Sequence, residues 1–282
     1  MGRGRRNYFT IKNIGVAVVI ALVFTFIKWY MFPMVRDGVD RAGIRWEYNT
    51  FSRTLKLQAT ENSNGKMQDY YYHWDNDVPE LLPPWYNYRK RCRKVVFGPG
   101  IKYIGNYTCR DFERLSSIEL SENIETIGDC AFYCCKHLKK LDCPASLRQI
   151  GESAFEGCEL EELVLNEGLQ SLYPDAFSGA KMEKVKIPNT VVRICDGVFA
   201  ENEELEEINI PESIDMLGVG VFAGDINLKR VRVETTKLEP RNGAFTGTGP
   251  DVVVEVPKEK YKEYSEGFFV HGLQETAKVV AY

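Results

Sequence analysis

The sequence predicts an α/β repeat solenoid dominated by strands, with a β-rich N-terminal segment and an N-terminal transmembrane helix. Three observations carry this prediction. Phenylalanine recurs every 22 or 23 residues between residues 132 and 245, apolar and polar residues alternate between these phenylalanines, and the first 36 residues are basic and then apolar. The composition is otherwise that of a globular protein, with 44% hydrophobic and 27% charged residues among 282, which excludes a disordered or collagen-like chain.

The N-terminal segment differs in charge from the rest of the chain. Residues 1–36 carry six cations and no acidic residue, so the overall net charge of −4 is an average of +6 here and −10 elsewhere. The stretch 14–35 is long enough to cross a bilayer at ~1.5 Å per residue. A cleaved secretory signal is the alternative, but no small-residue cleavage pattern follows the apolar run. We expect an uncleaved signal-anchor with a cytoplasmic N-terminus, and residues from about 36 onward outside.

Three columns of residues keep their register over seven copies. The first is phenylalanine, with Cys109 in its place in the first copy: Phe132, Phe155, Phe177, Phe199, Phe222 and Phe245. The second lies five residues earlier: Ile104, Ile127, Ile150, Leu172, Ile194, Leu217 and Pro240. The third lies ten or eleven residues later: Leu120, Cys143, Leu165, Ile187, Ile210, Val233 and Val256.

The residues around these columns predict the shape of each unit. Alternation such as that in 208–210 is typical of a short strand with one buried face. A second apolar pair follows, and then a compact Ala-Phe segment that we expect to form a helical turn. One unit cannot bury its own apolar face, so the copies must stack, with strands ~4.8 Å apart and the phenylalanines forming an internal column.

Two segments of this repeat, IGDCAFYCCKHL at 127–138 and IGESAFEGC at 150–158, carry a family resemblance. They resemble the BspA-type leucine-rich repeat, whose pattern is roughly I-G-x-x-A-F-x-x-C-x-x-L-x-x-I-x-I-P. The resemblance covers about 93–257 and implies a right-handed leucine-rich-repeat stack. It is interrupted at 172–187, which lacks both the glycine and the cysteine, and in the final copy.

The resemblance also extends to the flanking segments, which suggests a division of the whole chain. Residues 37–92 are similar to the β-rich segment that precedes such repeats, and 258–282 to the strand and short helix that close them. A solenoid needs atypical end units to cover its terminal core. We therefore expect a basic start with a signal-anchor (1–36), an N-terminal cap (37–92), about seven repeats (93–257) and a C-terminal cap (258–282).

The sequence offers little for catalysis. It has three histidines, and it contains no Ser/His/Asp order, phosphate-binding loop, dinucleotide-binding turn or zinc-protease helix. We predict that the protein is not an enzyme, with no catalytic residue, no cofactor and no metal site. An enzymatic alternative would need residues 70–77 to form a glycan site around His73. The acidic net charge argues against a nucleic-acid partner.

The eight cysteines fit the repeat better than a metal site. No second zinc half-site follows Cys130, Cys134 and Cys135 at ligand spacing. Free cysteine behaves as a small buried hydrophobe, which suits the four that fill repeat columns. These four are Cys109, Cys135, Cys143 and Cys158. A Cys135–Cys158 disulfide is the alternative, since adjacent rungs ~5 Å apart and an extracytoplasmic location would permit one.

Two surfaces are candidates for binding. The first is the solvent face of the strands, expected to be concave, whose candidate ligand-binding residues are Lys140, Asp142, Glu162, Lys184, Lys186, Glu207, Asn209, Arg230 and Arg232. Alternatively, these charges only keep the sheet soluble. The second is an aromatic patch of Tyr70, Tyr71, Tyr72 and Trp74, because exposed aromatic residues suit protein or glycan contacts. Trp46 and Trp85, in contrast, are expected in the core of the cap.

Together these features predict a membrane-anchored, surface-displayed protein that binds an extracellular protein, or alternatively a glycan. The resemblance implies a cell-surface role, for which adhesion is the main known activity of the family. The alternative is a structural or scaffolding protein of the cell envelope with no dedicated external ligand. The sequence does not define the ligand or the oligomeric state.

Overall fold

The computed structural model describes residues 35–71, 81–239 and 243–282. Nearly all of the expected membrane span, 14–35, lies outside these residues. Val35 and Arg36, which the sequence analysis assigns to the anchor, instead begin a strand, β1 (Val35–Val39). Within the described ranges, no helix has the length and apolar character needed to cross a bilayer.

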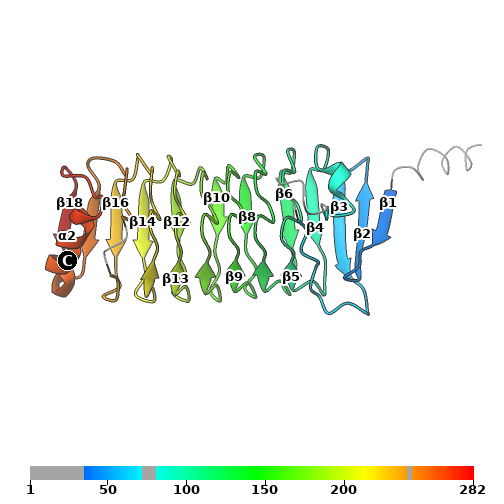
Figure 1. The fold of residues 1–282 in the computed structure, drawn as a ribbon, viewed down its shortest axis with the longest axis horizontal. Helices are drawn as coiled ribbons and strands as arrows, with labels where there is room; N and C mark the ends of the chain where they lie inside the picture. Colours follow the sequence, from blue (N-terminus) through cyan, green and yellow to red (C-terminus); the bar gives the residue numbers. More distant parts are fainter. Residues whose placement is uncertain (1–34, 72–80, 240–242) are drawn as a thin grey trace, which may run out of the picture.

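The repeats form two rows of parallel strands. Figure 1 shows the strands side by side along the long axis, from β1 at one end to α2 and β18 at the other. The long strands are β4 (Lys94–Phe97), β6 (Ser117–Leu120), β8 (Lys140–Asp142), β10 (Glu162–Val164), β12 (Lys184–Lys186), β14 (Glu207–Ile210), β16 (Arg230–Val233) and β17 (Val253–Val256). The short strands are β5 (Tyr103–Ile104), β7 (Thr126–Ile127), β9 (Gln149–Ile150), β11 (Ser171–Leu172), β13 (Arg193–Ile194) and β15 (Met216–Leu217).

The hydrogen bonding of the two rows differs. The six short strands make one continuous sheet in the order β15-β13-β11-β9-β7-β5. The long strands fall into three sheets: β1-β2-β3-β4-β6, then β10-β8, then β12-β14-β16-β17-β18. Register follows the repeat, so that each residue pairs with its counterpart 22 or 23 positions away, as Lys184 pairs with Glu207 and Glu207 with Arg230. The predicted parallel stacking is confirmed.

The phenylalanine column forms the centre of the core, as predicted. Successive rings from Phe132 to Phe245 are stacked with centroids 5.0–6.2 Å apart and interplanar angles of 4–15°. At each end the stack finishes with an edge-on ring. Phe97 of β4 lies at 79° to Phe132, and Phe268 of the C-terminal helix lies at 82° to Phe245. Offset or edge-to-face aromatic pairs contribute ~0.5–1.5 kcal/mol beyond the burial of their area.

The Ala-Phe segments are turns, so the expectation of helical turns is wrong. Each turn is bracketed by two residues with positive φ, such as Cys130 (φ 50°) and Cys134 (φ 57°) around Phe132. Left-handed residues interrupt an α-helix because its hydrogen bonds require right-handed dihedral angles in sequence. The turns instead bond to each other: the amide of Phe132 donates to the Ala154 carbonyl at 2.8 Å, and the amide of Phe155 to Ala176 at 2.9 Å.

The two ends of the solenoid have different caps. At the N-terminal end, β1, β2 (Ile44–Asn49) and β3 (Thr54–Ala59) are antiparallel, and β3 then pairs in parallel with β4. Trp85, beside the 3-10 helix η2 (Tyr86–Tyr88), is fully buried and its indole Nε1 donates to the Thr108 carbonyl at 2.9 Å. Trp46 is half-buried and packs against the same core.

At the C-terminal end, a short helical segment, η3 (Lys258–Lys260), leads into α2 (Tyr261–Val270). Strand β18 (Lys278–Ala281) then pairs in parallel with β17. Tyr264 of α2 is fully buried, and its hydroxyl accepts a hydrogen bond from the Leu238 amide and donates one to the Thr235 carbonyl. The helix therefore covers the last turn of the stack with both an apolar ring and a satisfied hydroxyl.

One column of the core is polar at its C-terminal end. The position held by Cys135 and Cys158 becomes Asn202 and then Asp225, both fully buried. The backbone N–H of Asn202 donates to Asp225 Oδ1 at 2.8 Å. Asp225 Oδ2 and both polar atoms of the Asn202 side chain have no protein partner. Burial raises the pKa of Asp225 to about 8. The hydrogen bond from the backbone of Asn202 lowers this pKa, and the nearby negative charge of Glu201 raises it.

Replacing one ring of the stack should strongly destabilise the protein. Phe177→Ala removes a fully buried side chain that contacts a ring on each side. We expect a loss of about 3–5 kcal/mol in the free energy of unfolding, measured by urea denaturation. Phe51→Ala is the matched control, because Phe51 is 82% exposed and its loss should cost less than about 0.5 kcal/mol. Equal midpoints for the two variants would contradict a core role for the stack.

The buried Asp225 should make stability depend on pH. Its folded pKa of about 8 lies above the ordinary value of 3.8, so the folded state holds a proton that the unfolded chain releases. The stability from this residue is complete below pH ~4 and is lost as the pH rises through ~8. Asp225→Asn should therefore melt at a higher temperature than the wild type near pH ~9 and show a smaller difference near pH ~4. Asp215→Asn, at an exposed position, serves as control; parallel pH profiles for Asp225→Asn and the wild type would refute this.

Candidate functional site: the outer face of the long strands

The candidate site is the solvent side of the long strands, which we call the outer face. In β8 and β12 the middle residue points into the core and the two flanking residues are exposed, and β14 and β16 continue the alternation. This places all nine candidate residues on one face, as predicted. They lie on two sheets: Lys140, Asp142 and Glu162 on β8 and β10, and the remaining six on β12, β14 and β16.

Many charges on the outer face are paired across neighbouring strands. Lys140 Nζ lies 2.7 Å from Glu162 Oε2, and Lys184 Nζ lies 3.5 Å from Glu207 Oε2. Opposite charges directly across a strand pair stabilise a sheet modestly, and exposed pairs contribute only about 0–1 kcal/mol. These pairs therefore set the charge pattern of the face more than its stability.

The C-terminal part of the outer face holds a denser cluster. Glu255 of β17 lies 3.6 Å from the Arg230 guanidinium and 3.1 Å from that of Arg232. The Arg232 guanidinium also lies 3.9 Å from the centroid of the Tyr282 ring. Neither Glu255 nor Tyr282 is among the nine candidate residues, so the structure adds both to this face. The adjacent β-branched residues Val279 and Val280 were the available signal for β18, because such residues favour a strand.

The pairing leaves a few polar groups available for a partner. In the part of the chain that the structure describes, Lys186 and Asp142 have no ion-pair partner, although both are exposed. Asn209 lies beside Lys186 in register, and Val164 lies beside Asp142 and is 42% exposed. A partner could therefore displace water from these side chains without breaking an existing pair.

One member of the predicted aromatic patch, Tyr70, does not lie on the surface. Tyr70 is buried rather than exposed, and its hydroxyl donates to Asp40 Oδ2 at 3.1 Å while its ring meets Trp85 edge-on at 5.7 Å. Burial and the adjacent Asp40 carboxylate raise the pKa of Tyr70 well above its ordinary value. Tyr71 is 51% exposed. Tyr72 and Trp74, like His73, lie outside the described residues.

The cysteines of the described chain are all free, and no group of three or more potential metal ligands occurs in that part. The four cysteines predicted to be core residues are buried. Burial raises the pKa of the Cys109 and Cys135 thiols well above the usual range, and that of Cys143 to about 12. Instead of a disulfide, the thiol of Cys135 donates to the Cys109 carbonyl at 3.2 Å, and that of Cys158 to the Phe132 carbonyl at 3.1 Å.

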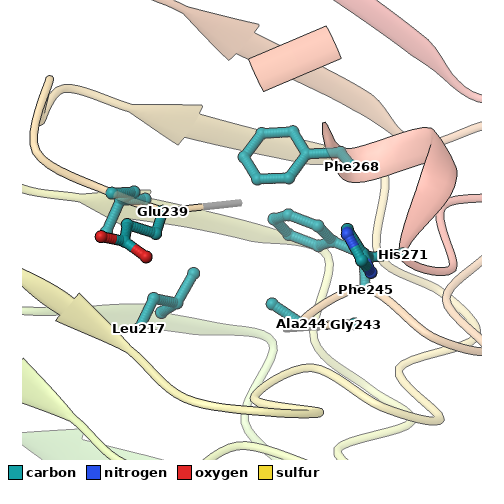
Figure 2. A pocket seen from close by; sticks show the side chains of 8 residues that line it. Leu217, Glu239, Gly243, Ala244, Phe245, Phe268 and His271 are labelled. Atoms are coloured by element: carbon teal, nitrogen blue, oxygen red, sulfur yellow. The ribbon is translucent and has the colours of Figure 1, made fainter. Parts of the chain in front are cut away.

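An enclosed hollow lies under the C-terminal cap, between the last ring of the phenylalanine stack and α2. Figure 2 shows Phe245 and Phe268 on one side of it and Leu217 on the other. The space is about 10 Å³, which is close to the minimum for a single water molecule. This hollow is therefore a packing gap, and binding of a macromolecule falls to the open surfaces.

The repeats also match a known family of proteins. The model of the BspA type leucine rich repeat region matches six copies, over residues 85–158 and 131–249, which is more than half of the chain. This chain belongs to that family. The membership accounts for the repeat length, the Ala-Phe turns and the paired rows of strands. No curated protein matches the chain.

Several solved structures resemble the chain. A leucine-rich repeat protein from Bacteroides ovatus has 22% identity and a TM-score of 0.46, over 78% of this chain and 59% of that one. This chain thus spans about three-fifths of the length of that protein. One from Eubacterium ventriosum has 15% identity and a TM-score of 0.38, with 78% of each chain covered. A leucine rich cell surface protein from Faecalibacterium prausnitzii has 12% identity and a TM-score of 0.32, over 87% and 94%.

The thiols should differ sharply in reactivity. Iodoacetamide at pH ~8 should alkylate Cys134 and Cys195, which are partly exposed, and leave Cys109, Cys135 and Cys158 unlabelled in the folded chain. The reason is that burial excludes the reagent from all three thiols. It also raises the pKa of Cys109 and Cys135, which disfavours the thiolate, the nucleophilic form. Peptide mass spectrometry measures each site, with a fully denatured sample as control. Labelling of Cys135 at the rate of Cys134 would contradict the packing described here.

Proposed function

We propose that this protein is a membrane-anchored, surface-displayed leucine-rich-repeat protein that binds another protein through the outer face, in adhesion or a related protein–protein interaction. The carrying observation is the outer face itself: a row of side chains in regular register on strands fixed by a continuous core. Such a surface is preorganised, so a partner need not order it on binding.

The chemistry of the outer face favours a polar protein partner. Lys186 and Asn209 offer a positive charge and an amide beside one another, whereas Asp142 and Val164 offer a carboxylate beside an apolar contact. A mixed surface of this kind gives specificity through complementary charge more than through buried area. The Arg232–Tyr282 contact adds a cation and an aromatic ring, residue types that are enriched in binding hot spots.

The proposed location rests on the sequence of the first residues. The stretch 14–35 is apolar and follows a cluster of arginines, which supports a signal-anchor with the repeats outside. Strand β1 begins at Val35, so the span and the first strand of the cap would follow each other directly. A truncation that tests the anchor should therefore remove residues 1–34, because removing 1–36 would cut into β1.

A crosslinking experiment tests the outer face and identifies its partner in the same step. A photoreactive amino acid placed at Lys186 in the full chain, displayed on cells, should capture a discrete extracellular protein. The matched control carries the photoreactive amino acid in place of Arg193, which is exposed on the short strand β13. This control should not capture the protein that is captured from position 186. Equal capture from both positions, or capture of a glycan alone, would refute the proposal.

Once a partner is captured, reversal of charge should weaken its binding. Lys186→Glu combined with Asp142→Lys changes two unpaired charges and breaks no ion pair of the fold. We expect a dissociation constant at least ~10-fold higher, measured by surface plasmon resonance, which corresponds to ~1.4 kcal/mol. Arg193→Glu should leave affinity unchanged. An unchanged affinity for the double variant would exclude this part of the face.

A further inference from the structure

A second charged surface runs along the turns that lead into the long strands. Two positions recur there, three residues and one residue before each strand, on either side of a buried residue such as Leu115 or Leu138. We call this surface the turn edge. Its side chains before β4, β6 and β8 are Arg91, Arg93, Arg114, Ser116, His137 and Lys139. Before β10, β12 and β14 they are Glu159, Glu161, Lys181, Glu183, Glu204 and Glu206.

The turn edge is therefore divided into two halves of opposite charge. The first three turns carry four cations and no carboxylate at these positions, and the next three carry five carboxylates and one lysine. Arg93, Arg114 and His137 line one shallow hollow with Ser116. Glu161, Glu183 and Glu204 line another with Lys181 and Lys184. The first hollow therefore has cations and no carboxylate, whereas the second has three carboxylates and two lysines.

Internal pairing occurs where the halves meet and at the far end of the acidic half, where Lys229, one residue before β16, pairs with Glu206. Lys139 lies 2.9 Å from Glu159 and 3.2 Å from Glu161, and Glu159 also lies 3.5 Å from Lys181. Beyond this junction, among the residues that the structure describes, Arg93 and Arg114 have no carboxylate within ion-pair distance, and Glu183 and Glu204 have no cation. Like charges that stand in a row without partners repel one another, and an opposite surface would relieve that repulsion.

Each half spans three turns, and a seventh turn, with Asn227 and Lys229, lies beyond the acidic half. The equal length of the two oppositely charged halves selects the partner. A polyanion would suit the basic half and be repelled by the acidic half beside it. A second copy of the chain satisfies both, because a two-fold axis between the third and fourth turns places turn one over turn six, two over five and three over four. We propose that the protein forms an antiparallel two-fold dimer through its turn edges, with the basic half of each copy against the acidic half of the other.

The geometry indicates a weak and salt-sensitive dimer. Six turns at ~4.8 Å each give an edge ~29 Å long. An edge of this length and of little width buries less than the ~800 Å² per partner of a standard stable interface. The attraction must then come mainly from charge, which is screened over ~10 Å at 0.1 M salt. The dimer uses the turns and leaves the outer face open, so it does not depend on the proposed function.

Charge-swapped variants of the full chain in neutral detergent test the dimer by sedimentation velocity. The wild type should be dimeric at ~20 mM salt and monomeric at ~500 mM. One variant, Arg93→Glu with Arg114→Glu, brings the net charge of the basic half from +4 to zero, because Arg91 and Lys139 remain. The other, Glu183→Arg with Glu204→Arg, brings the net charge of the acidic half from −4 to zero. Each alone should be monomeric at low salt, and an equimolar mixture of the two should form heterodimers. Thermal melting by circular dichroism verifies that both variants are folded.

The control reverses two exposed cations elsewhere, Arg193→Glu with Lys237→Glu, and should dimerise as the wild type does. A wild type that is monomeric at low salt would overturn the proposal. This includes the case in which the monomer binds the polyanion dextran sulfate through Arg93 and Arg114. Variants that each dimerise like the wild type would overturn it as well, because association would then lie outside the turn edge. So would a mixture of folded variants that stays monomeric.

Discussion

The constraint that determines this structure is that no single repeat can satisfy its own apolar side chains or its own backbone. A unit of 22 or 23 residues has one buried phenylalanine and a few aliphatic residues, and alone it would leave them in water. Its turn amides point to the neighbouring unit, as the amide of Phe177 does toward the Val198 carbonyl at 3.0 Å. Ring stacking and amide bonding therefore run along the same axis, and each contact links neighbouring units.

The same constraint explains the two caps. At the ends there is no further repeat, so a ring from a different element meets the last phenylalanine edge-on: Phe97 at one end and Phe268 at the other. The polar column inside the C-terminal repeats is an exception, because not all of its polar groups are satisfied by neighbouring units. Asn202 and Asp225 occupy positions that cysteine fills elsewhere, and three of their polar atoms have no protein partner. Those repeats carry a cost that the N-terminal repeats do not.

Much of the fold could be predicted from the sequence because the information is periodic. The columns of Phe, Ile and Leu predicted the strands, the parallel register and the outer face. The composition of 1–36 suggested an anchor, but its last two residues, Val35 and Arg36, belong to β1. The incorrect predictions concern segments in which the repeat pattern is absent or misleading. Tyr70 stands in an irregular segment, where nothing in the sequence reveals that its ring turns inward to Asp40 and Trp85. The left-handed φ of Cys130 and Cys134 was missed, although the equivalent positions in a later repeat are Gly220 and Gly224, and glycine favours a positive φ.

The candidate site was foreseen in position but not in pairing. Ion pairs such as Arg232–Glu255 depend on rotamers across strands 23 residues apart, which sequence spacing alone does not determine. The stack also has a consequence for the reach of the molecule. Its first strand and its C-terminal helix lie at opposite ends of the long axis, and the short strands continue from unit to unit as one sheet. Duplicating one unit would therefore move the C-terminal end ~4.8 Å farther from the N-terminal end while both ends kept their packing. Genetic gain or loss of whole units is thus a direct means of adjusting how far this protein extends.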